Sequence, residues 1–431
     1  MKLLFVSLGC DKNLVDSEEM LGLLTGNGFE IVDDETEAEA IVVNTCCFIN
    51  DAKEESVNTI LEMAEYKKTG SCKVLVVTGC MAQRYKNEII EEVPEVDAVL
   101  GTTSYGDILK AIREAMEGKH FQEFKDIDYL PEKLGKRVLT TGGHFGYLKI
   151  AEGCDKHCTY CIIPYARGPV RSLSLEQAVE QTRQLAAEGY REIVLTGIEI
   201  SSWGHDFKNG QSLIDLLEAL SAAAPEVRLR LGSLEPRTVT EDFCRRAAAT
   251  GQVCRHFHLS LQSGCDRTLA RMNRKYNTAE FLACVERLRR YFPGCALTAD
   301  MITGFPGETE ADQAAAVAFL EQVGFAAVHV FPYSRRPGTK ADAMPEQLSH
   351  AVKSARAHEA QRVADACKQR YLVQQVGQTL PVLFETEHDG SWVGHSDNYC
   401  LVRAAGDDLR GLVKNVKISA VSGQMLVGDL V

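Results

Sequence analysis

The 431-residue chain lacks any apolar run as long as the roughly 18 residues that a transmembrane helix needs, and it lacks short-period repeats and low-complexity segments. Its 45% apolar and 25% charged residues suit a globular protein and exclude a collagen-like or disordered one. The first ten residues faintly imitate a signal or lipoprotein peptide, but the apolar stretch is too short, and Asp11 and Lys12 follow at once. We therefore expect a buried first strand, a cytoplasmic protein and no membrane partner.

Positive charge is also scarce, since 47 Lys and Arg residues face 60 Asp and Glu residues and leave a net charge of −13. Residues 1–146 hold 15 basic and 27 acidic residues, residues 147–376 hold 28 and 26, and residues 377–431 hold 4 and 7. Because binding of nucleic-acid phosphates requires clustered Lys and Arg, the first segment is a poor surface for nucleic acid. Only the middle segment has room for such a surface.

Apolar strands alternate with amphipathic helices in residues 1–118, which predicts an N-terminal parallel α/β sheet domain. The strands are expected at residues 3–8, 40–44, 73–78 and 98–100, with helices at about 13–27, 52–68, 82–92 and 107–116. Residues 119–146 are polar and contain glycine, so we expect a linker there.

A second alternation of strands and helices fills residues 147–376. Six consecutive βα units predict a central, partial TIM-like (β/α)6 barrel, and a basic helix at about 346–376 follows it. Residues 377–431 carry short β-like runs separated by turn residues, which predicts a small antiparallel β-barrel. The six barrel strands are expected near residues 147–151, 192–196, 228–232, 256–261, 296–303 and 327–331.

Cysteine is abundant, with 15 residues, and a reducing compartment makes a disulfide framework an unlikely use for them. The strongest pattern is Cys154, Cys158 and Cys161, just after the first barrel strand. Three thiolates at this spacing can hold a [4Fe–4S] cluster and leave one iron open. The open iron can bind S-adenosylmethionine, whose reductive cleavage gives a 5′-deoxyadenosyl radical. The alternative is a zinc knuckle with His157 as fourth ligand, but no second CxxC lies nearby, so we favour the cluster and an exposed His157.

A second set of cysteines follows three predicted strands of the N-terminal domain: Cys10, Cys46 and Cys80. Neighbouring parallel strands end at the same edge of a sheet, so these thiols are expected to converge there. The alternative is coincidence, because cysteine is among the most buried residue types. Cys47 competes with Cys46 for the middle position. The remaining cysteines lack ligand spacing and are expected to be structural: Cys47, Cys72, Cys244, Cys254, Cys265, Cys284, Cys295, Cys367 and Cys400.

These motifs together resemble the methylthiotransferases of the radical S-adenosylmethionine superfamily, and the resemblance covers essentially the whole chain. It selects Cys46 over Cys47, and it makes residues 377–431 similar to the family's TRAM domain, a substrate-recognition module. The matching segments are Gly9-Cys10 with Asn13, Asn44-Thr45-Cys46, Thr78-Gly79-Cys80, and residues 152–161, 163–168 and 302–308.

The resemblance implies an enzyme that replaces an unactivated C–H hydrogen with a methylthio group. It implies two [4Fe–4S] clusters, one on Cys154, Cys158 and Cys161 that makes the radical, and one on Cys10, Cys46 and Cys80 that carries or supplies sulfur. One S-adenosylmethionine gives the radical and another gives the methyl group. An electron donor such as flavodoxin or ferredoxin is expected, and no catalytic residue beyond the cluster ligands is assigned.

Six residues are expected to contact S-adenosylmethionine. Tyr160 lies inside the cluster loop, and Ile302 and Gly304 lie in the segment that ends the fifth barrel strand. Tyr160 and Ile302 can pack near the adenine, and Gly304 allows close approach of the backbone to a ligand. Glu199, Gln262 and Arg167 follow strands or the cluster loop, where a ligand can reach them. Each has a structural alternative as an ordinary loop or turn residue.

Two branches of the family compete for the substrate. Residues 7–18 and 48–56 resemble the branch that modifies an aspartate of a small-subunit ribosomal protein. Later segments of the chain resemble the other branch, which acts on threonylcarbamoyl-adenosine beside the tRNA anticodon. Because substrate contacts should come from the barrel mouth and the C-terminal domain, we predict methylthiolation at C2 of that tRNA nucleoside, with the ribosomal protein as the alternative. The tRNA-like segments are residues 195–198, 260–264, 271–276, 329–334 and 394–399.

Charge supports the tRNA only in part. Basic clusters at residues 267–275, 287–290 and 335–340 are expected to contact phosphates, although 287–290 also fits a solvated helix face. The acidic C-terminal segment instead suits a basic ribosomal protein. A different class of function, a non-catalytic iron–sulfur carrier, would also use two cysteine triads, but it does not need a six-unit barrel.

Overall fold

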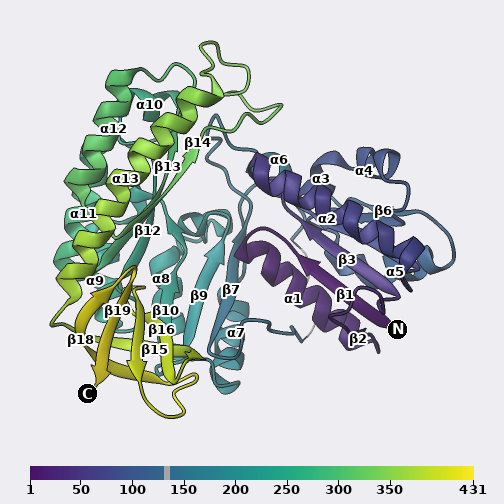
Figure 1. The fold of residues 1–431 in the computed structure, drawn as a ribbon, viewed down its shortest axis with the longest axis horizontal. Helices are drawn as coiled ribbons and strands as arrows, with labels where there is room; N and C mark the ends of the chain where they lie inside the picture. The colour runs from purple at the N-terminus through teal and green to yellow at the C-terminus, as the bar shows by residue number, and fades with distance from the viewer. Residues whose placement is uncertain (131–135) are drawn as a thin grey trace. The chain divides into compact units, whose positions relative to one another are not determined.

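A computed structural model describes residues 1–130 and 136–431 (Figure 1). The chain forms two compact units, and each is described by itself. The first unit comprises residues 1–140, 152–156 and 161–171, and the second comprises residues 141–151, 157–160 and 172–431. Residues 131–135, which belong to the predicted linker at 119–146, lie outside the described residues.

The first unit is built on a six-stranded parallel sheet with the order β2-β1-β3-β4-β5-β6. This confirms the predicted parallel α/β fold. The two edge strands were not predicted, because they are only two and three residues long and have no apolar run, and β6 falls within the stretch predicted as linker. The strands are β1 (Lys2–Ser7), β2 (Glu30–Ile31), β3 (Ala40–Thr45), β4 (Val74–Gly79), β5 (Ala98–Leu100) and β6 (Phe121–Glu123).

Helices cover both faces of this sheet, as its continuously apolar strands require. Side chains alternate along β4, so that Val74 and Val76 pack with α1 and α5 on one face. Leu75 and Val77 pack with α2, α3 and α4 on the other face. A further short helix, α6 (Ile163–Arg167), belongs to this unit. The covering helices are α1 (Asp11–Thr25), α2 (Asn50–Thr69), α3 (Cys80–Tyr85), α4 (Asn87–Glu92) and α5 (Ile108–Met116), the last preceded by η1 (Tyr105–Asp107).

The second unit contains two four-stranded sheets, β10-β9-β7-β8 and β11-β12-β13-β14. All six predicted barrel strands are present as β7, β9, β10, β12, β13 and β14, with parallel pairing wherever they are neighbours in a sheet. The two additional strands are two residues long. The strands are β7 (Phe145–Glu152), β8 (Arg171–Ser172), β9 (Glu192–Gly197), β10 (Arg228–Leu231), β11 (Ser233–Leu234), β12 (His256–Gln262), β13 (Ala296–Thr303) and β14 (Ala327–Pro332).

Helices follow these strands in the order expected of βα units, and the long helix α13 runs beside β13 and β14 (Figure 1). Capping boxes fix the starts of α8, α11 and α12, where an Asn, Ser or Thr and an acidic residue three positions later exchange hydrogen bonds. The helices are α7 (Leu175–Ala187), α8 (Leu213–Ala223), α9 (Glu241–Ala249), α10 (Asp266–Arg271), α11 (Thr278–Tyr291), α12 (Glu310–Val323) and α13 (His350–Gln375), with short η2 (Ile200–Ser202), η3 (His205–Phe207) and η4 (Pro236–Thr238).

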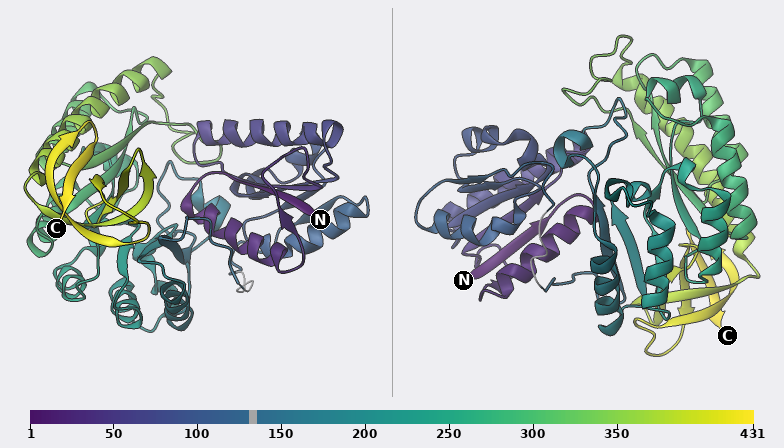
Figure 2. Two further views of the ribbon diagram at one scale, coloured as in Figure 1. Left: turned by 60° about the horizontal axis from the view of Figure 1, so that its bottom comes forward. Right: turned by 180° about the vertical axis from the view of Figure 1, so that it is seen from behind.

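The C-terminal strands close into a small barrel with the order β15-β16-β17-β19-β18, drawn in yellow in Figure 2. The predicted small β-barrel is therefore confirmed, and its pairings are antiparallel except for β17 with β19. Alternating residues such as Val382, Phe384 and Val402 are buried and fill its interior. The strands are β15 (Thr379–His388), β16 (Ser391–Ser396), β17 (Leu401–Ala405), β18 (Val413–Ser422) and β19 (Met425–Leu430).

Two arginines of β10 fasten this small barrel within the second unit. Arg228 and Arg230 both donate to the Glu192 carboxylate, with Nε–O distances of 2.5 and 2.6 Å. The same guanidinium groups donate to backbone carbonyl oxygens of Pro381 and of residues 395–397. Residues 395–397, within the segment 394–399, therefore bind β10 and hold the small barrel in place.

None of the helices in the described residues has the length and apolar character required to cross a membrane.

Candidate functional site

Cys46 and Cys80 follow β3 and β4 directly, and Cys10 lies three residues after the end of β1. Cys10 is exposed and precedes α1, whereas Cys46 and Cys80 are buried. The parallel register pairs Ser7 with Asn44 and Thr45 with Gly79, so the three strands end at the same edge.

Glycines allow the cysteine-bearing loops to approach one another. Gly9 has φ +92°, and a Cβ at this position would lie 2.7 Å from the Cβ of Cys46 and 3.0 Å from its Sγ. Gly79 has φ +95°, and a Cβ there would lie 2.3 Å from Oδ1 of Asn44. Both positions therefore require glycine, for conformation and for space.

Asn13, at the start of α1, ties the same loops together. Its Nδ2 donates to the carbonyl oxygens of Leu8 at 3.0 Å and Thr45 at 2.9 Å. Two carbonyl acceptors on the nitrogen fix the orientation of the amide, so Oδ1 faces the Cys80 thiol, with 3.7 Å to Sγ. One fully buried side chain thus links the ends of β1 and β3 to the cysteine that begins α3.

Cys46 and Cys47 differ in their surroundings. Cys46 lies against Gly9, and its backbone N–H donates to Oγ of Ser56 at 3.0 Å. Cys47 belongs to the apolar cluster formed with α2, although Cys80 belongs to that cluster as well. The contact with the Cys10 loop favours Cys46 as the member of the triad.

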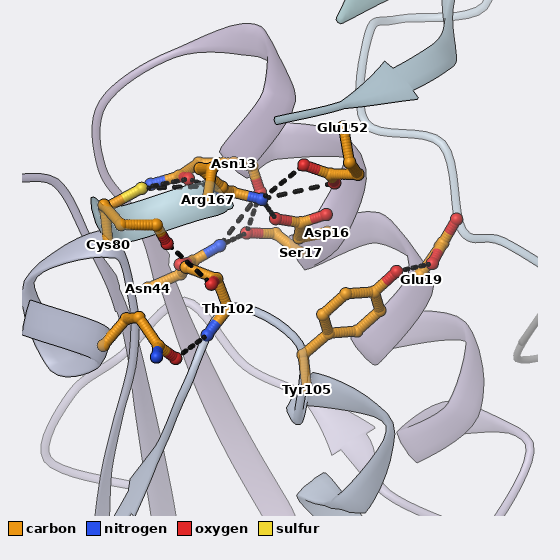
Figure 3. A network of polar contacts seen from close by, with 12 residues as sticks. Asn13, Asp16, Ser17, Glu19, Asn44, Cys80, Thr102, Tyr105, Glu152 and Arg167 are labelled. Atoms are coloured by element: carbon orange, nitrogen blue, oxygen red, sulfur yellow. Dashed lines mark hydrogen bonds and ion pairs between the residues drawn. The ribbon is translucent and has the colours of Figure 1, made fainter. Parts of the chain in front are cut away.

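Arg167 places a guanidinium group at this edge of the sheet (Figure 3). Its Nε donates to Sγ of Cys80 at 3.3 Å, and its Nη2 donates to Oδ1 of Asn13. Its Nη1 donates to Asp16 at 2.8 Å and to both oxygens of Glu152 at 3.3 Å. The side chain is 1% exposed, so these contacts replace its hydration.

The thiols at this edge respond to burial and to Arg167. Burial raises the pKa of Cys80 to about 12, and the guanidinium of Arg167 is the largest influence that opposes this rise. Burial also raises the pKa of Cys46. Desolvation acts to lower the pKa of Arg167, but Asp16, Cys80 and Glu152 hold it well above its usual value. The guanidinium is therefore a permanent positive charge beside a sulfur atom.

The donor set fits a thiolate-bound iron–sulfur cluster. Three thiols meet at one edge, and a cation and an N–H group point at one of the sulfurs, which favours the thiolate that such clusters require. Among the residues that the structure describes, no three His, Cys, Asp or Glu side chains stand close enough to hold a single metal ion. A four-iron cluster is larger than an ion, so its ligands need not converge as closely.

The residues of the second triad are divided between the two units and are described separately. In the first unit, the Cys154 N–H donates to the Gly168 carbonyl at 2.9 Å, and its Sγ lies 3.5 Å from the Lys156 N–H. Cys161, partly exposed, lies in the same unit, on the segment that leads into α6. His157, in the second unit, is exposed as expected, with φ +48°.

Cys158, in the second unit, also receives a hydrogen bond from an arginine. Arg274 donates through Nη1 to Sγ of Cys158 at 3.1 Å, through Nε to the Tyr276 hydroxyl at 3.1 Å and through Nη2 to the Ser260 carbonyl at 3.3 Å. Desolvation acts to lower the pKa of Arg274, but Tyr276, Tyr160 and Cys158 keep it well above its usual value. Arg274 was expected to contact tRNA phosphates and instead donates to the sulfur of Cys158.

Five of the six residues predicted to contact S-adenosylmethionine lie near the carboxyl ends of strands or in the cluster loop of the second unit. Tyr160 is buried with its ring edge-on to Phe305, at 6.4 Å between centroids. Gln262 ends β12 with φ +62°. Glu199 follows β9, Ile302 lies near the end of β13, and Gly304 follows that strand. Arg167 is the exception, because its contacts are with Cys80, Asn13, Asp16 and Glu152 of the first unit.

The sequence reasoning missed the roles of Asp16, Glu152 and Arg274. Asp16 and Arg167 are 151 residues apart, so no local spacing links them. The sequence of α1 contains one pattern that could have indicated the site. The buried face of this helix begins with the polar residues Asn13, Asp16 and Ser17 and is apolar further along. Polar residues at i, i+3 and i+4 on the buried face of a helix indicate a site rather than a core.

Two family models match the chain. The description "Uncharacterized protein family UPF0004" covers residues 2–101, and "Radical SAM superfamily" covers residues 148–320.

Curated relatives match almost the whole chain. The "ribosomal protein uS12 methylthiotransferase RimO" of Lachnoclostridium phytofermentans is 43% identical over 99% of both chains. The proteins of the same name from Pelotomaculum thermopropionicum and Clostridioides difficile are 39% and 35% identical; they cover 92% and 100% of this chain, and 90% and 99% of their own.

Solved structures support the fold. The radical S-adenosylmethionine methyltransferase TsrM from Kitasatospora setae matches with a TM-score of 0.58 and 16% identity, over 79% of this chain and 76% of its own. The cobalamin-dependent radical enzyme OxsB matches with a TM-score of 0.52 and 12% identity, over 85% of this chain and 56% of its own.

The predicted tRNA substrate is wrong. The relatives named above, which match nearly the full length of the chain, are all named for ribosomal protein uS12. The structure supplies a physical reason, since the arginines expected to contact phosphates donate to groups of their own chain. Arg267 binds Asp312, Arg271 binds the Pro306 carbonyl, Arg287 the Val239 carbonyl, Arg289 the Val323 carbonyl, Arg290 Glu241, and Arg335 Asp342.

Proposed function

Because this chain belongs to the radical S-adenosylmethionine methylthiotransferase family, we propose that it attaches a methylthio group to ribosomal protein uS12, at the β-carbon of an aspartate. Enzymes of this family use two [4Fe–4S] clusters and S-adenosylmethionine. The observation that carries the proposed substrate is the 35–43% identity to uS12 methylthiotransferases over 92–100% of the chain. Residues 7–18 and 48–56 resemble the same branch. Membership of this enzyme family does not support the alternative function of a non-catalytic iron–sulfur carrier.

In this proposal Cys154, Cys158 and Cys161 hold one cluster, and Cys10, Cys46 and Cys80 hold the auxiliary cluster. When bound, the first supplies reductive cleavage of S-adenosylmethionine, and the second supplies an iron site for sulfur. The contribution of the chain is to hold the thiolates. Gly9 and Gly79 give the auxiliary ligands room, and Asn13 fixes the loops that carry them.

Tyr160, Glu199, Gln262, Ile302 and Gly304 are proposed to line the S-adenosylmethionine site. The turn at Gly304, with φ +69°, is held by its N–H, which donates to Oε1 of Glu308 at 2.8 Å. Arg356 in turn donates to the same carboxylate oxygen at 2.7 Å. This support keeps the backbone after β13 rigid, as a site that positions a cofactor requires.

Charge agrees with a basic protein substrate. Residues 377–431 carry 4 basic and 7 acidic residues, and ribosomal proteins are generally basic because they bind RNA. A ribosomal protein substrate would also place the reaction in the cytoplasm. An electron donor such as flavodoxin or ferredoxin stays a prediction, as do the boundaries of the TRAM-like domain at 377–431.

The deciding experiment supplies the reconstituted enzyme with S-adenosylmethionine, a reductant and both candidate substrates, small ribosomal subunits and tRNA bearing threonylcarbamoyl-adenosine. Mass spectrometry of uS12 peptides and of tRNA nucleosides reads out the product, with the Cys154→Ala variant as control. We expect the methylthio mass increase on a uS12 aspartate and none on the nucleoside. Modification of the nucleoside alone would overturn the proposed substrate.

A further inference from the structure

We propose that Arg167 is a positioning residue of the auxiliary cluster, which holds the Cys80 thiolate through Nε–H and sets the cluster's reduction potential. The proposal rests on the proposed ligation by Cys10, Cys46 and Cys80, and it moves Arg167 from the S-adenosylmethionine site to the sulfur site. It concerns how the chain controls the cluster, beyond the identity of the ligands.

The geometry of the guanidinium group carries the proposal. Three of its nitrogens point to different groups: Nε to the Cys80 sulfur, Nη2 to the Asn13 amide oxygen, and Nη1 to the carboxylates of Asp16 and Glu152 (Figure 3). A planar fork held on three sides cannot rotate away from the sulfur. Asn13 is itself fixed by two carbonyl oxygens, so the whole arrangement is rigid.

Burial makes the charge effective. Arg167, Asp16 and Glu152 are 1%, 3% and 4% exposed, so water screens their interactions with the cluster weakly. Hydrogen bonds to the sulfur ligands and the net charge around a cluster are two of the factors that set its potential. A cation that donates to a thiolate stabilises the more negative, reduced cluster and so raises the potential, whereas the nearby carboxylates lower it.

Arg167 lies on the same short segment of the chain as Cys161. Arg167 ends α6, six residues after Cys161, and the segment 161–171 belongs to the first unit. Within that unit the Ala166 carbonyl accepts a hydrogen bond from Oγ1 of Thr102 at 2.8 Å, and Ala166 packs in the apolar core. One short anchored segment therefore carries a proposed ligand of the radical-forming cluster and the arginine that contacts the auxiliary ligand.

The test uses the full chain with Cys154, Cys158 and Cys161 changed to Ala, so that only the auxiliary cluster contributes to the spectra. Redox titration followed by electron paramagnetic resonance gives its potential, and the rate of iron loss to a chelator gives its retention. The variants are Arg167→Met, Arg167→Lys and Asp16→Asn. Lys67→Met is the matched control, because Lys67 pairs with Asp97, away from the cysteine loops of the same unit.

We expect Arg167→Met to lower the potential and Asp16→Asn to raise it, with Arg167→Lys between Met and the wild type. Loss of an outer-sphere partner should also speed iron release from Arg167→Met by about 10- to 100-fold. Lys67→Met should match the parent in both measurements. Opposite shifts in two variants are expected of electrostatic control and are not expected of general disruption of the fold.

The outcomes separate this proposal from the ligand assignment. If the parent binds no iron, or if adding Cys80→Ala leaves the iron content unchanged, the ligation by Cys10, Cys46 and Cys80 is wrong. If the parent binds iron but the Arg167 and Asp16 variants keep its potential and release rate, the ligation stands and the role of Arg167 is wrong. Should Arg167→Met fail to fold, Arg167→Lys decides the matter, because a potential and a release rate equal to those of the parent would show that the Nε–H contact has no role.

Discussion

The two cysteine triads proposed as cluster ligands differ in how the chain brings their members together. Cys10, Cys46 and Cys80 come from the ends of three strands and are brought together by the sheet, whereas Cys154, Cys158 and Cys161 lie within eight residues of one loop. In both triads one arginine donates to one sulfur, at 3.3 Å in the first and 3.1 Å in the second. The partners of the arginines differ.

At the sheet edge, Arg167 is shared with two buried carboxylates, so the local charge without the sulfurs is negative. In the second unit, Arg274 is shared with a hydroxyl and a carbonyl oxygen, which are neutral, so its positive charge is retained. A cluster beside a retained positive charge is the easier one to reduce. With the proposed ligation, this difference predicts that the cluster on Cys154, Cys158 and Cys161 is the easier of the two to reduce.

The largest expected effect comes from removing either triad. Wild-type protein should reconstitute with about eight irons, and each triple Ala variant with about four. The Cys154, Cys158 and Cys161 variant should lose S-adenosylmethionine cleavage entirely. The Cys10, Cys46 and Cys80 variant should still form 5′-deoxyadenosine but no methylthio product. Iron analysis and chromatography of the nucleoside products check this, and wild-type protein that saturates at four irons would contradict it.

A smaller effect is expected from the arginine of the second unit. Arg274→Met removes the donor to Cys158, and it should slow S-adenosylmethionine cleavage by about 10- to 100-fold while the auxiliary cluster remains loaded. Arg167→Met should leave cleavage close to wild type. Lys275→Met is the neighbouring control, because Lys275 is exposed and its ammonium group donates to the Asn273 side chain. Equal cleavage rates in Arg274→Met and Lys275→Met would remove the parallel between the two triads.

Much of this arrangement could be predicted from the sequence. Strand periodicity located β1, β3, β4 and β5 and the six barrel strands, and the position of each cysteine after a strand located the sheet-edge triad. The arginine contacts could not be predicted, because Arg167 meets Cys80 across 87 residues and Arg274 meets Cys158 across 116. Only the folded chain brings these groups together.

The substrate prediction failed for a related reason. Residues 271–276 and 394–399 were interpreted as substrate-recognition segments. Arg274 instead donates to the sulfur of Cys158, and the carbonyl oxygens of residues 395–397 accept hydrogen bonds from Arg228 and Arg230. Segments with structural tasks can be shared between branches that differ in substrate, so they discriminate poorly. The segments at 7–18 and 48–56 matched the branch to which the curated relatives belong.

The buried charges around Arg167 and around Glu192 are opposite in balance, and the Glu192 site predicts how the stability of the fold depends on pH. Two carboxylates surround Arg167, whereas two arginines surround Glu192. Burial acts to raise the pKa of Glu192, but Arg230 and Arg228 outweigh it and lower the pKa to about 2. A depressed carboxyl pKa stabilises the fold above its unfolded value of 4.5, and this stability is lost as pH falls from there toward 2.

The corresponding contribution is of order 3 kcal/mol at neutral pH, from a shift of roughly two and a half pKa units. Glu192→Gln should therefore lower the unfolding free energy of the second unit at pH 7 and flatten its decline between pH 5 and 3. Urea unfolding followed by the fluorescence of Trp203 and Trp392, which both belong to the second unit, measures both quantities across this range. A wild-type slope that persists unchanged in Glu192→Gln would show that other carboxylates cause the acid sensitivity.

The smallest expected effect is that of Cys47→Ala, which is compared with the same change at its neighbour Cys46 at the end of β3. Cys46 lies against Gly9 and beside the Cys10 loop, while Cys47 packs in the apolar cluster with residues of α2. Cys46→Ala should therefore lose auxiliary iron and methylthio product, because a ligand is removed. Cys47→Ala should keep both at wild-type levels and lose only about 1 kcal/mol of stability from the small cavity that it leaves. Iron content and product yield measured side by side on the two single variants decide which sulfur binds. The reverse result would place Cys47 in the triad, and the contact between Gly9 and Cys46 would then be only packing at the edge of the sheet.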